Sequence, residues 1–149
     1  MEIKLLGLDS INEISDFVWY VMGESGQFPN QVYFSPNEFK NVLHFMINRD
    51  MNVGLLVFYG AFQGDKMLGI VGFEPYCSRI SYLYVLPEYQ RKGIGSKLLD
   101  VIIRGIMDTP SVILRAHRDA VPMYEKYGFK KNGDDSPFSI GMEYVLRRK

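Results

Sequence analysis

The fold is decided by the segment Val85-Leu86-Pro87-Glu88-Tyr89-Gln90-Arg91-Lys92-Gly93-Ile94-Gly95-Ser96-Lys97-Leu98-Leu99. An apolar strand ends at Pro87, a short basic turn with two glycines follows, and a helical pattern then begins. Such a turn directs backbone N–H groups, at the positive end of a helix, into one concavity. The segment therefore predicts a binding site for a ligand that carries phosphate.

Two familiar phosphate motifs are excluded residue by residue. A P-loop needs Gly-Lys-Ser/Thr at its end, whereas here Gly95 is followed by Ser96 and Lys97. The dinucleotide fingerprint needs a third glycine where Leu98 stands. The bland alternative is a strand-to-helix turn whose glycines only permit a tight bend. The basic residues directly before Gly93 favour ligand binding instead, while Lys97 is interpreted as a solvated helix residue.

Composition narrows the class of protein. The 149 residues predict one domain, 1–149, and a charged fraction of 23% with 47% hydrophobic residues is typical of a soluble protein. Seventeen basic residues balance seventeen acidic ones, so nucleic acid is not an expected partner. No apolar stretch is long enough to span a membrane. The single cysteine, Cys77, fits the cytoplasm, and two histidines give no metal-ligand spacing.

Periodicity predicts an alternation of strands and helices in the order strand, two helices, three strands, helix, strand, helix, two strands. The strands are expected at Ile3–Leu8, Leu55–Phe62, Met67–Phe73, Ile80–Leu86, Val112–Arg115, Phe129–Lys130 and Phe138–Leu146. The helices are expected at 11–22, from Pro36 to about Ile47, at Ile94–Met107 and at Ala120–Tyr127. The strands around the glycine turn form a right-handed parallel crossover, and hairpin neighbours make the rest antiparallel.

Two blocks of this sequence resemble the GNAT superfamily of acetyl-CoA-dependent acyltransferases. Gln90-Arg91-Lys92-Gly93-Ile94-Gly95 matches the family's Gln/Arg-x-x-Gly-x-Gly/Ala signature, and Met123-Tyr124-Glu125-Lys126-Tyr127-Gly128-Phe129 resembles its Leu-Tyr-x-x-x-Gly-Phe block. The resemblance implies an α/β (α+β) acyl-CoA N-acyltransferase fold. Its central sheet is mixed and mostly antiparallel, with six to seven strands flanked by about four helices.

The resemblance also implies how coenzyme A is bound. Its pyrophosphate would lie on the turn, and its pantetheine arm would run beside the backbone of Leu83 to Val85, where the Val85 N–H faces the thioester carbonyl. His117 stands where relatives hold a residue that contacts the cofactor, although a structural histidine is an equal alternative. The implied cofactor-binding residues are Leu83, Tyr84, Val85, Gln90, Arg91, Lys92, Gly93, Ile94, Gly95, Ser96 and His117.

Tyr124 resembles the family's general acid, which protonates the departing thiolate; the alternative is a tyrosine that only packs on a helix face. Relatives supply a glutamate as base early on the strand before the turn, but here that position holds Arg79. Glu74 is therefore the candidate base, acting through water, and a solvated loop carboxylate is the alternative. Cys77 shows no activating partner in sequence, which argues against a covalent acetyl-cysteine.

These inferences predict an N-acetyltransferase that moves an acetyl group from acetyl-CoA to a primary amine of a small molecule or peptide in a ternary complex. The alternatives are a non-catalytic acyl-CoA-binding sensor or interaction module, and a nucleotide-phosphate binder of another fold. A homodimer is also possible. The loop Gly23–Ser35 would roof the acceptor cleft. Aromatic residues that line this cleft or belong to the core are Trp19, Tyr20, Phe28, Tyr33 and Phe34.

Overall fold

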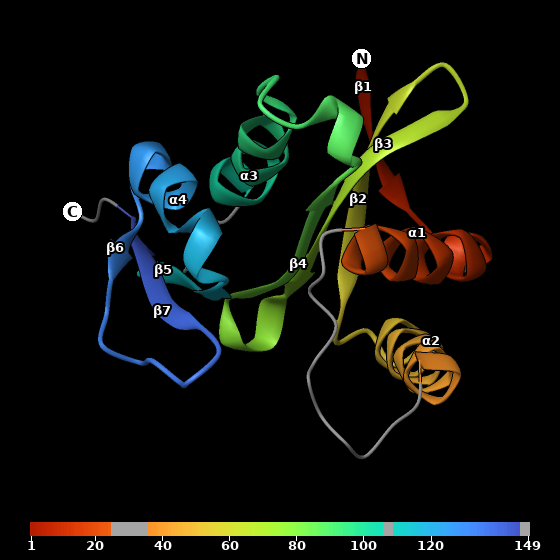
Figure 1. Cartoon of the computed structure of the whole chain (residues 1–149), viewed down its shortest axis with the longest axis horizontal. Helices are drawn as coiled ribbons and strands as arrows, with labels where there is room; N and C mark the ends of the chain where they lie inside the picture. The colour runs from red at the N-terminus through yellow and green to blue at the C-terminus, as the bar shows by residue number, and fades with distance from the viewer. Residues whose placement is uncertain (25–35, 106–108, 147–149) are drawn as a thin grey trace.

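One seven-stranded sheet organises the chain in a computed structural model that describes residues 1–24, 36–105 and 109–146 (Figure 1). Its strand order is β1-β2-β3-β4-β5-β7-β6, and only the β4–β5 pair is parallel. The strands are β1 (Glu2–Leu6), β2 (Val57–Gln63), β3 (Lys66–Glu74), β4 (Arg79–Val85), β5 (Ser111–Ala116), β6 (Lys130–Lys131) and β7 (Ile140–Val145). The helices are α1 (Ile11–Glu24), α2 (Pro36–Asn52), α3 (Ile94–Gly105) and α4 (Val121–Tyr127).

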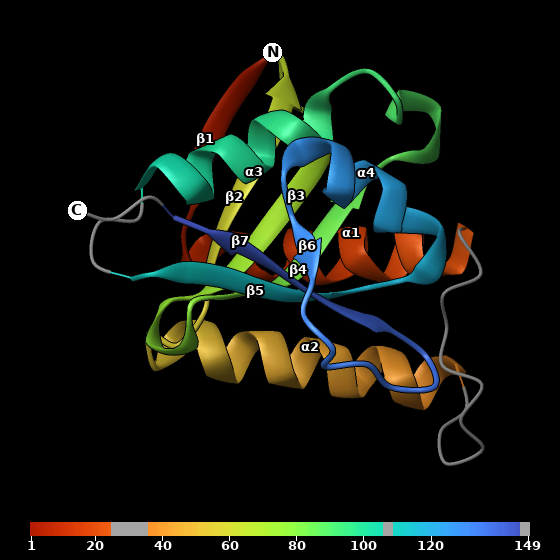
Figure 2. The same ribbon diagram turned by 90° about the vertical axis from the view of Figure 1, so that its left-hand side faces the viewer.

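Helices cover both faces of the sheet and divide the core in two. α3 and α4 lie on one face, whereas α1 and α2 lie on the other (Figures 1 and 2). Side chains alternate along β4, so Leu83 and Val85 pack toward α3 while Tyr82 and Tyr84 pack toward α1 and α2. The two faces of β4 therefore belong to different cores.

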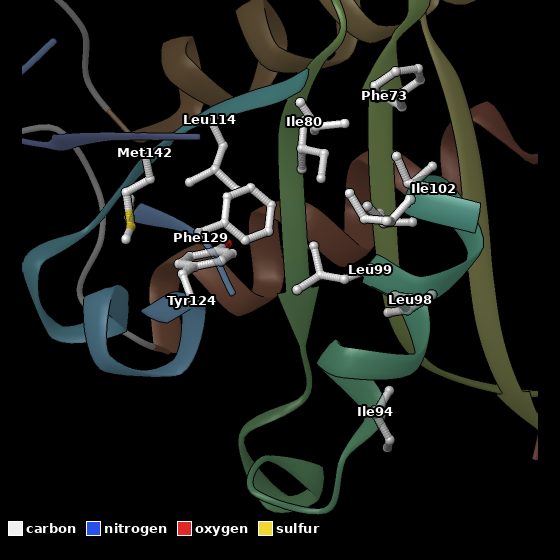
Figure 3. Close-up of a cluster of buried hydrophobic side chains, with 14 of the residues drawn as sticks. Phe73, Ile80, Ile94, Leu98, Leu99, Ile102, Leu114, Tyr124, Phe129 and Met142 are labelled. Carbon is white, nitrogen blue, oxygen red and sulfur yellow. The ribbon is translucent and has the colours of Figure 1, made fainter. Parts of the chain in front are cut away.

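The helix after the glycine turn is held by one apolar stripe. Its buried side chains recur at helical spacing and face β3 and β4 (Figure 3). They are Ile94, Leu98, Leu99, Ile102 and Ile103. Burying a side chain of this size contributes about 1.5–3 kcal/mol, so the stripe fixes the start of α3 firmly against the sheet.

The predicted order of elements is confirmed, with differences at their ends. β1 stops at Leu6 because Leu8–Ser10 form a 3₁₀ turn, and β7 starts at Ile140 because Ser136 and Ser139 hydrogen-bond each other in the preceding loop. α2 runs to Asn52, one turn beyond the predicted end. Pro122 lies in the first turn of α4, as its missing N–H requires.

β4 carries an irregularity that positions the site. Phe73 of β3 pairs with Ile80, whereas the next residue back, Gly72, pairs with Tyr82. Ser81 therefore has no partner in the ladder and forms a β-bulge. The bulge reverses which side chains face each core and bends the strand where β4 and β5 part.

No helix in the described ranges is long and apolar enough to cross a membrane.

Candidate active site

The site is built on the divergence of β4 and β5. These strands pair only through Arg79 and Ile80 on β4 with Ile113 and Leu114 on β5, and then separate. The gap between them opens into a cavity between the two strands and the start of α4. Its lining residues are Ile80, Ser81, Tyr82, Leu83, Tyr84, Leu114, Arg115, Ala116, His117, Ala120 and Tyr124.

Backbone groups of β4 face this gap. Leu86 donates its N–H to Leu68 O on the β3 side, at 2.9 Å. Because successive N–H groups alternate between the two edges of a strand, Leu83 and Val85 direct theirs toward the gap. Val85 O is on the same edge, where it accepts a hydrogen bond from Gln90 Nε2 at 3.0 Å. The edge of β4 is thus ready to pair with an extended ligand.

The glycine turn leaves room for a ligand. Arg91 and Gly93 both have left-handed backbone, with φ of 65° and 85°, so the chain folds back on itself before α3 begins. A Cβ placed on Gly95, the second residue of α3, would meet no protein atom within 4 Å. The start of α3 is open on that side, and its first N–H groups have no partner within the helix.

Two lysines reinforce the positive charge of the turn. Lys92 Nζ lies 5.4 Å from the centre of the Tyr89 ring, and Lys66 Nζ lies 5.0 Å from the same ring. Lys66 also donates to Tyr89 Oη at 3.4 Å. Lys66 comes from the start of β3, far from the turn in sequence, and sequence analysis missed it because only the β3–β4 pairing brings it there.

Tyr124, on α4, is a buried residue that lines the cavity. Its ring packs edge-on against Phe129 at 5.6 Å between centres, and only 7% of the residue is exposed (Figure 3). Burial, and to a lesser extent the nearby Tyr84 phenol, raises the pKa of Tyr124. The phenol therefore keeps its proton throughout the neutral range, as a proton donor must. Tyr127, on the same helix, instead donates to Asp100 Oδ1 on α3 at 2.7 Å.

Glu74 is the centre of a polar cluster at the closed end of the gap. Its Oε1 accepts from Arg79 Nη2 at 2.8 Å, Tyr76 Oη at 3.3 Å and Cys77 Sγ at 3.4 Å. Its Oε2 accepts from Ser81 Oγ at 2.7 Å. Burial alone would raise the pKa of Glu74, but hydrogen bonds from Ser81 and Arg79 outweigh it and hold the pKa below the ordinary 4.5.

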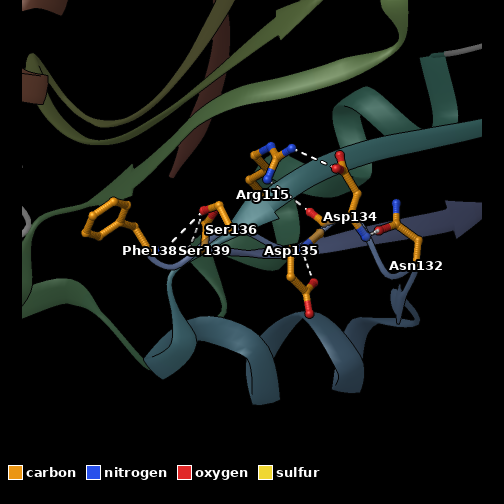
Figure 4. A network of polar contacts seen from close by, with 8 residues as sticks. Arg115, Asn132, Asp134, Asp135, Ser136, Phe138 and Ser139 are labelled. Carbon is orange, nitrogen blue, oxygen red and sulfur yellow. Dashed lines mark hydrogen bonds and ion pairs between the residues drawn. The ribbon is translucent and has the colours of Figure 1, made fainter.

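Arg115 on β5 and His117, which directly follows this strand, border the cavity. His117 Nδ1 accepts from the Asp119 N–H at 3.3 Å, so the neutral ring presents Nε2–H as a donor. Arg115 is ion-paired with Asp134 Oδ1 at 2.8 Å and also donates to Asp134 O (Figure 4). The loop between β6 and β7 thus satisfies the guanidinium that would otherwise point free charge at the cavity.

The structure places four of the sequence-predicted residues in the lining of the cavity. Leu83, Tyr84, His117 and Tyr124 line the cavity. Glu74 does not line it, and Ser81 stands between Glu74 and the cavity. Sequence analysis assigned no role to Ser81, because a bulge leaves no local signature in the pattern of β4.

The predicted aromatic lining of the acceptor cleft is only partly described. Trp19 packs against Phe39 at 6.1 Å between ring centres, beside the core under α1 and α2, and Tyr20 is half exposed. Phe28, Tyr33 and Phe34 lie outside the described residues. No group of three His, Cys, Asp or Glu side chains in the described part of the chain is placed to hold a metal ion.

Comparisons with known proteins identify the family and the fold. Residues 29–144 match the model of the acetyltransferase (GNAT) domain family. The chain is similar to the PaiA N-acetyltransferase from Thermoplasma acidophilum in complex with coenzyme A, with 21% identity over 98% of this chain and 100% of that one, and a TM-score of 0.66. It is also similar to Tetrahymena GCN5, with 14% identity over 99% and 97% of the chains and a TM-score of 0.72.

A third similar structure is a predicted acetyltransferase with acetyl-CoA from Clostridium acetobutylicum. It shares 18% identity over 92% of this chain and 94% of that one, with a TM-score of 0.71. No curated protein matches the sequence significantly.

The lowered pKa of Glu74 predicts a pH-dependent contribution to stability. A carboxyl whose pKa is lower in the folded state stabilises the protein above its unfolded pKa and loses this effect as pH falls through the folded value. Glu74→Gln should therefore be less stable than the native chain at pH 7, and the difference should shrink below about pH 4.5. Urea unfolding at pH 7 and pH 3.5 measures it. Glu125→Gln, which removes an exposed carboxylate on α4, is the control. If the difference in unfolding free energy between Glu74→Gln and the native chain is the same at pH 3.5 as at pH 7, the lowered pKa of Glu74 is contradicted.

Proposed function

The chain belongs to the GNAT acetyltransferase family, and on that premise we propose that it transfers an acetyl group from acetyl-CoA to a primary amine. The observation that carries the proposal is the gap between β4 and β5. It joins an open, positively charged turn at one end to a buried phenol beside free backbone N–H groups. A thioester and a pyrophosphate on one extended ligand match these features in the order in which they occur along β4.

We propose that coenzyme A lies along the exposed edge of β4. Its pyrophosphate occupies the open space at Gly93 and Gly95, where N–H groups at the start of α3 and the charge of Lys92 stabilise anionic oxygens. The amides of its pantetheine arm pair with the free edge at Leu83 and Val85 as an added strand would. The similarity to the Thermoplasma acidophilum protein, whose structure contains coenzyme A, supports this donor. The single cysteine and this donor favour the cytoplasm as the compartment.

Acyl transfer passes through a tetrahedral adduct whose oxygen carries negative charge. The N–H groups of Leu83 and Val85 both face the gap, and Leu83 lies at the cavity. A backbone N–H on this edge of β4 therefore stabilises the oxyanion. Because it belongs to a strand held by β3, the donor does not have to reorganise when the charge develops.

Tyr124 is proposed as the acid that protonates the departing thiolate. Its raised pKa makes it a weak acid in absolute terms. The thiolate leaves into the same buried space, however, so the same loss of hydration raises the pKa of the thiol as well. The pKa values of the Tyr124 phenol and of the departing thiol are therefore raised together, because the cavity disfavours both anions.

Glu74 is proposed as the carboxylate that finally receives the acceptor's proton. A carboxyl of such low pKa is a poor base for a free ammonium ion. We therefore assign it to the proton that leaves after attack, when the nitrogen is bonded to the acyl carbon and is far more acidic. The acceptor itself reaches the cavity as the neutral amine, deprotonated by solvent.

Direct transfer in a ternary complex is favoured over a covalent acetyl-cysteine. Cys77 is absent from the cavity lining, and its thiol donates to Glu74. Burial, followed by the contact with Glu74, raises the pKa of the Cys77 thiol. A protonated thiol outside the cavity is a poor nucleophile for a thioester within it.

The proposed function is tested by mixing the protein with acetyl-CoA and a panel of primary amines and peptides while free thiol is measured. Thiol release that depends on the amine, with a matching acetylated product by mass spectrometry, is expected. Tight binding of acetyl-CoA without amine-dependent thiol release would instead support the non-catalytic acyl-CoA-binding module.

Gly95→Glu tests where the pyrophosphate lies. A Cβ at this position meets no protein atom within 4 Å, so the new side chain starts in open space, but it brings bulk and negative charge to the proposed pyrophosphate site. We expect the Kd for coenzyme A to rise about tenfold or more, a loss of roughly 1.4 kcal/mol. Gly105→Glu, the same change in open space at the other end of α3, should bind normally in calorimetry. Equal affinities of the two variants would move the pyrophosphate elsewhere.

Tyr124→Phe and Tyr127→Phe separate a chemical role from a structural one on the same helix. Tyr124→Phe should lower kcat by roughly 10²-fold while the Kd for coenzyme A changes little. Tyr127→Phe loses the hydrogen bond to Asp100 and should lower stability by about 1–2 kcal/mol with turnover retained. Steady-state kinetics and urea unfolding give both numbers. A fully active Tyr124→Phe enzyme would remove this phenol from the mechanism.

A further inference from the structure

Ser81 is the residue at which the cavity and the Glu74 cluster meet. It lines the cavity, and its hydroxyl donates to Glu74 Oε2 at 2.7 Å. That length is typical of an O–H group bonded to a carboxylate anion. A carboxylate offers only acceptor atoms, so the hydroxyl proton must lie on the Glu74 side. The lone pairs of Ser81 Oγ are what remains for a ligand.

The other polar side chains of the cavity are donors, or carry an O–H proton that is not shown bonded to a carboxylate in the described part of the chain. Neutral His117 uses Nδ1 to accept from a backbone N–H and presents Nε2–H, a donor. Arg115 is only a donor and is committed to Asp134. The phenols of Tyr82, Tyr84 and Tyr124 keep their protons, because burial raises the pKa of each, so each can donate a hydrogen bond as well as accept one. Ser81 is the cavity hydroxyl whose proton is committed elsewhere.

We propose that Ser81 Oγ accepts the N–H of the acceptor amine and passes the proton released after attack to Glu74. The inference rests on the proposed function and adds to it the atom that binds the acceptor nitrogen. It also favours acceptors that carry a polar hydrogen on the attacking atom, because an oxygen that only accepts forms no hydrogen bond with an ether, a ketone or a tertiary amine.

The spacing along β4 agrees with this role. Ser81 and Leu83 are two residues apart, which in a regular strand corresponds to about 6.6 Å. A nitrogen at an attack distance of about 3–3.5 Å from the thioester carbon fits in that span, with one hydrogen bond to Oγ and the carbonyl oxygen on a β4 N–H. The bulge makes this possible, because it adds Ser81 to the strand where the gap begins.

The proton transfer balances at every atom. The amine nitrogen forms a bond to the acyl carbon, and the C–S bond breaks with its electron pair on sulfur. The nitrogen's proton moves to Ser81 Oγ while the Oγ proton moves to Glu74 Oε2. The thiolate takes the Tyr124 proton. Solvent then removes the proton from Glu74 and restores the one on Tyr124.

Ser81→Ala, Ser81→Thr and Ser15→Ala test the inference in the full-length protein with an amine that the native enzyme acetylates. Ser81→Ala should lower kcat/KM for the amine about 10²-fold, with a raised KM and an unchanged Kd for coenzyme A. Ser81→Thr retains a hydroxyl on a strand residue and should recover most of the activity. Ser15→Ala removes another buried hydroxyl, on α1, which has no hydrogen-bond partner among the described residues, and should match the native enzyme.

A double-mutant cycle completes the test. Glu74→Gln should cost activity in the native background and little more in Ser81→Ala, because the two residues act as one relay. The inference is overturned if the losses of activity from Glu74→Gln and Ser81→Ala simply add, or if Ser81→Ala retains the native kcat/KM. In either case the proposed function still stands as long as the native enzyme shows amine-dependent turnover. If Ser81→Ala does not fold, a Ser81→Thr enzyme that binds coenzyme A yet remains inactive overturns it equally. A native enzyme without turnover fails the proposed function instead.

Discussion

The separation of β4 from β5 is the constraint on which the rest of the structure depends. Two packed parallel strands would satisfy each other's backbone groups along their length, but here pairing stops after Ile80 and Leu114. The free edge of β4 must then be satisfied by water or by a ligand of strand-like shape. The apolar stripe of α3 packs on β3 and β4, and Tyr124 packs against Phe129 on the other side of the gap. Packed side chains therefore fix both borders of the gap.

The cluster around Glu74 lies beside the paired end of β4 and β5. The carboxylate is at the end of β3, whereas Arg79 and Ser81 are on β4, so its hydrogen bonds join the two strands before the bulge and at the bulge residue itself. A bulge without such support leaves an unpaired residue free to shift register. The same bonds that hold the pKa of Glu74 down therefore also fix where Ser81 faces the cavity.

Local patterns explain what could be predicted from the sequence and what could not. The order of elements, the glycine turn and the position of Tyr124 depend on spacing within single segments, such as the apolar period of α3 and the residues around Gly128. The contact of Lys66 with Tyr89 and the bond from Ser81 to Glu74 depend on strand register. Register is set by cross-strand packing, and a one-residue bulge has no signature in a single strand.

The hydroxyl between Glu74 and the cavity has an electrostatic consequence. Two like charges 4 Å apart near a protein surface repel by about 4 kcal/mol, and this repulsion halves when the distance doubles. A carboxylate in the gap itself would face the developing oxyanion and the departing thiolate at close range. Because Ser81 lies between Glu74 and the cavity, the Glu74 carboxylate is farther from both anions and stays paired with Arg79. It still accepts the hydrogen bond from Ser81 Oγ and so polarises this hydroxyl at the cavity. Glu74 can thus receive the proton through Ser81 without repelling the oxyanion and the thiolate at close range. A glutamate at position 79 that faced the gap directly would accept the proton but would also repel these anions.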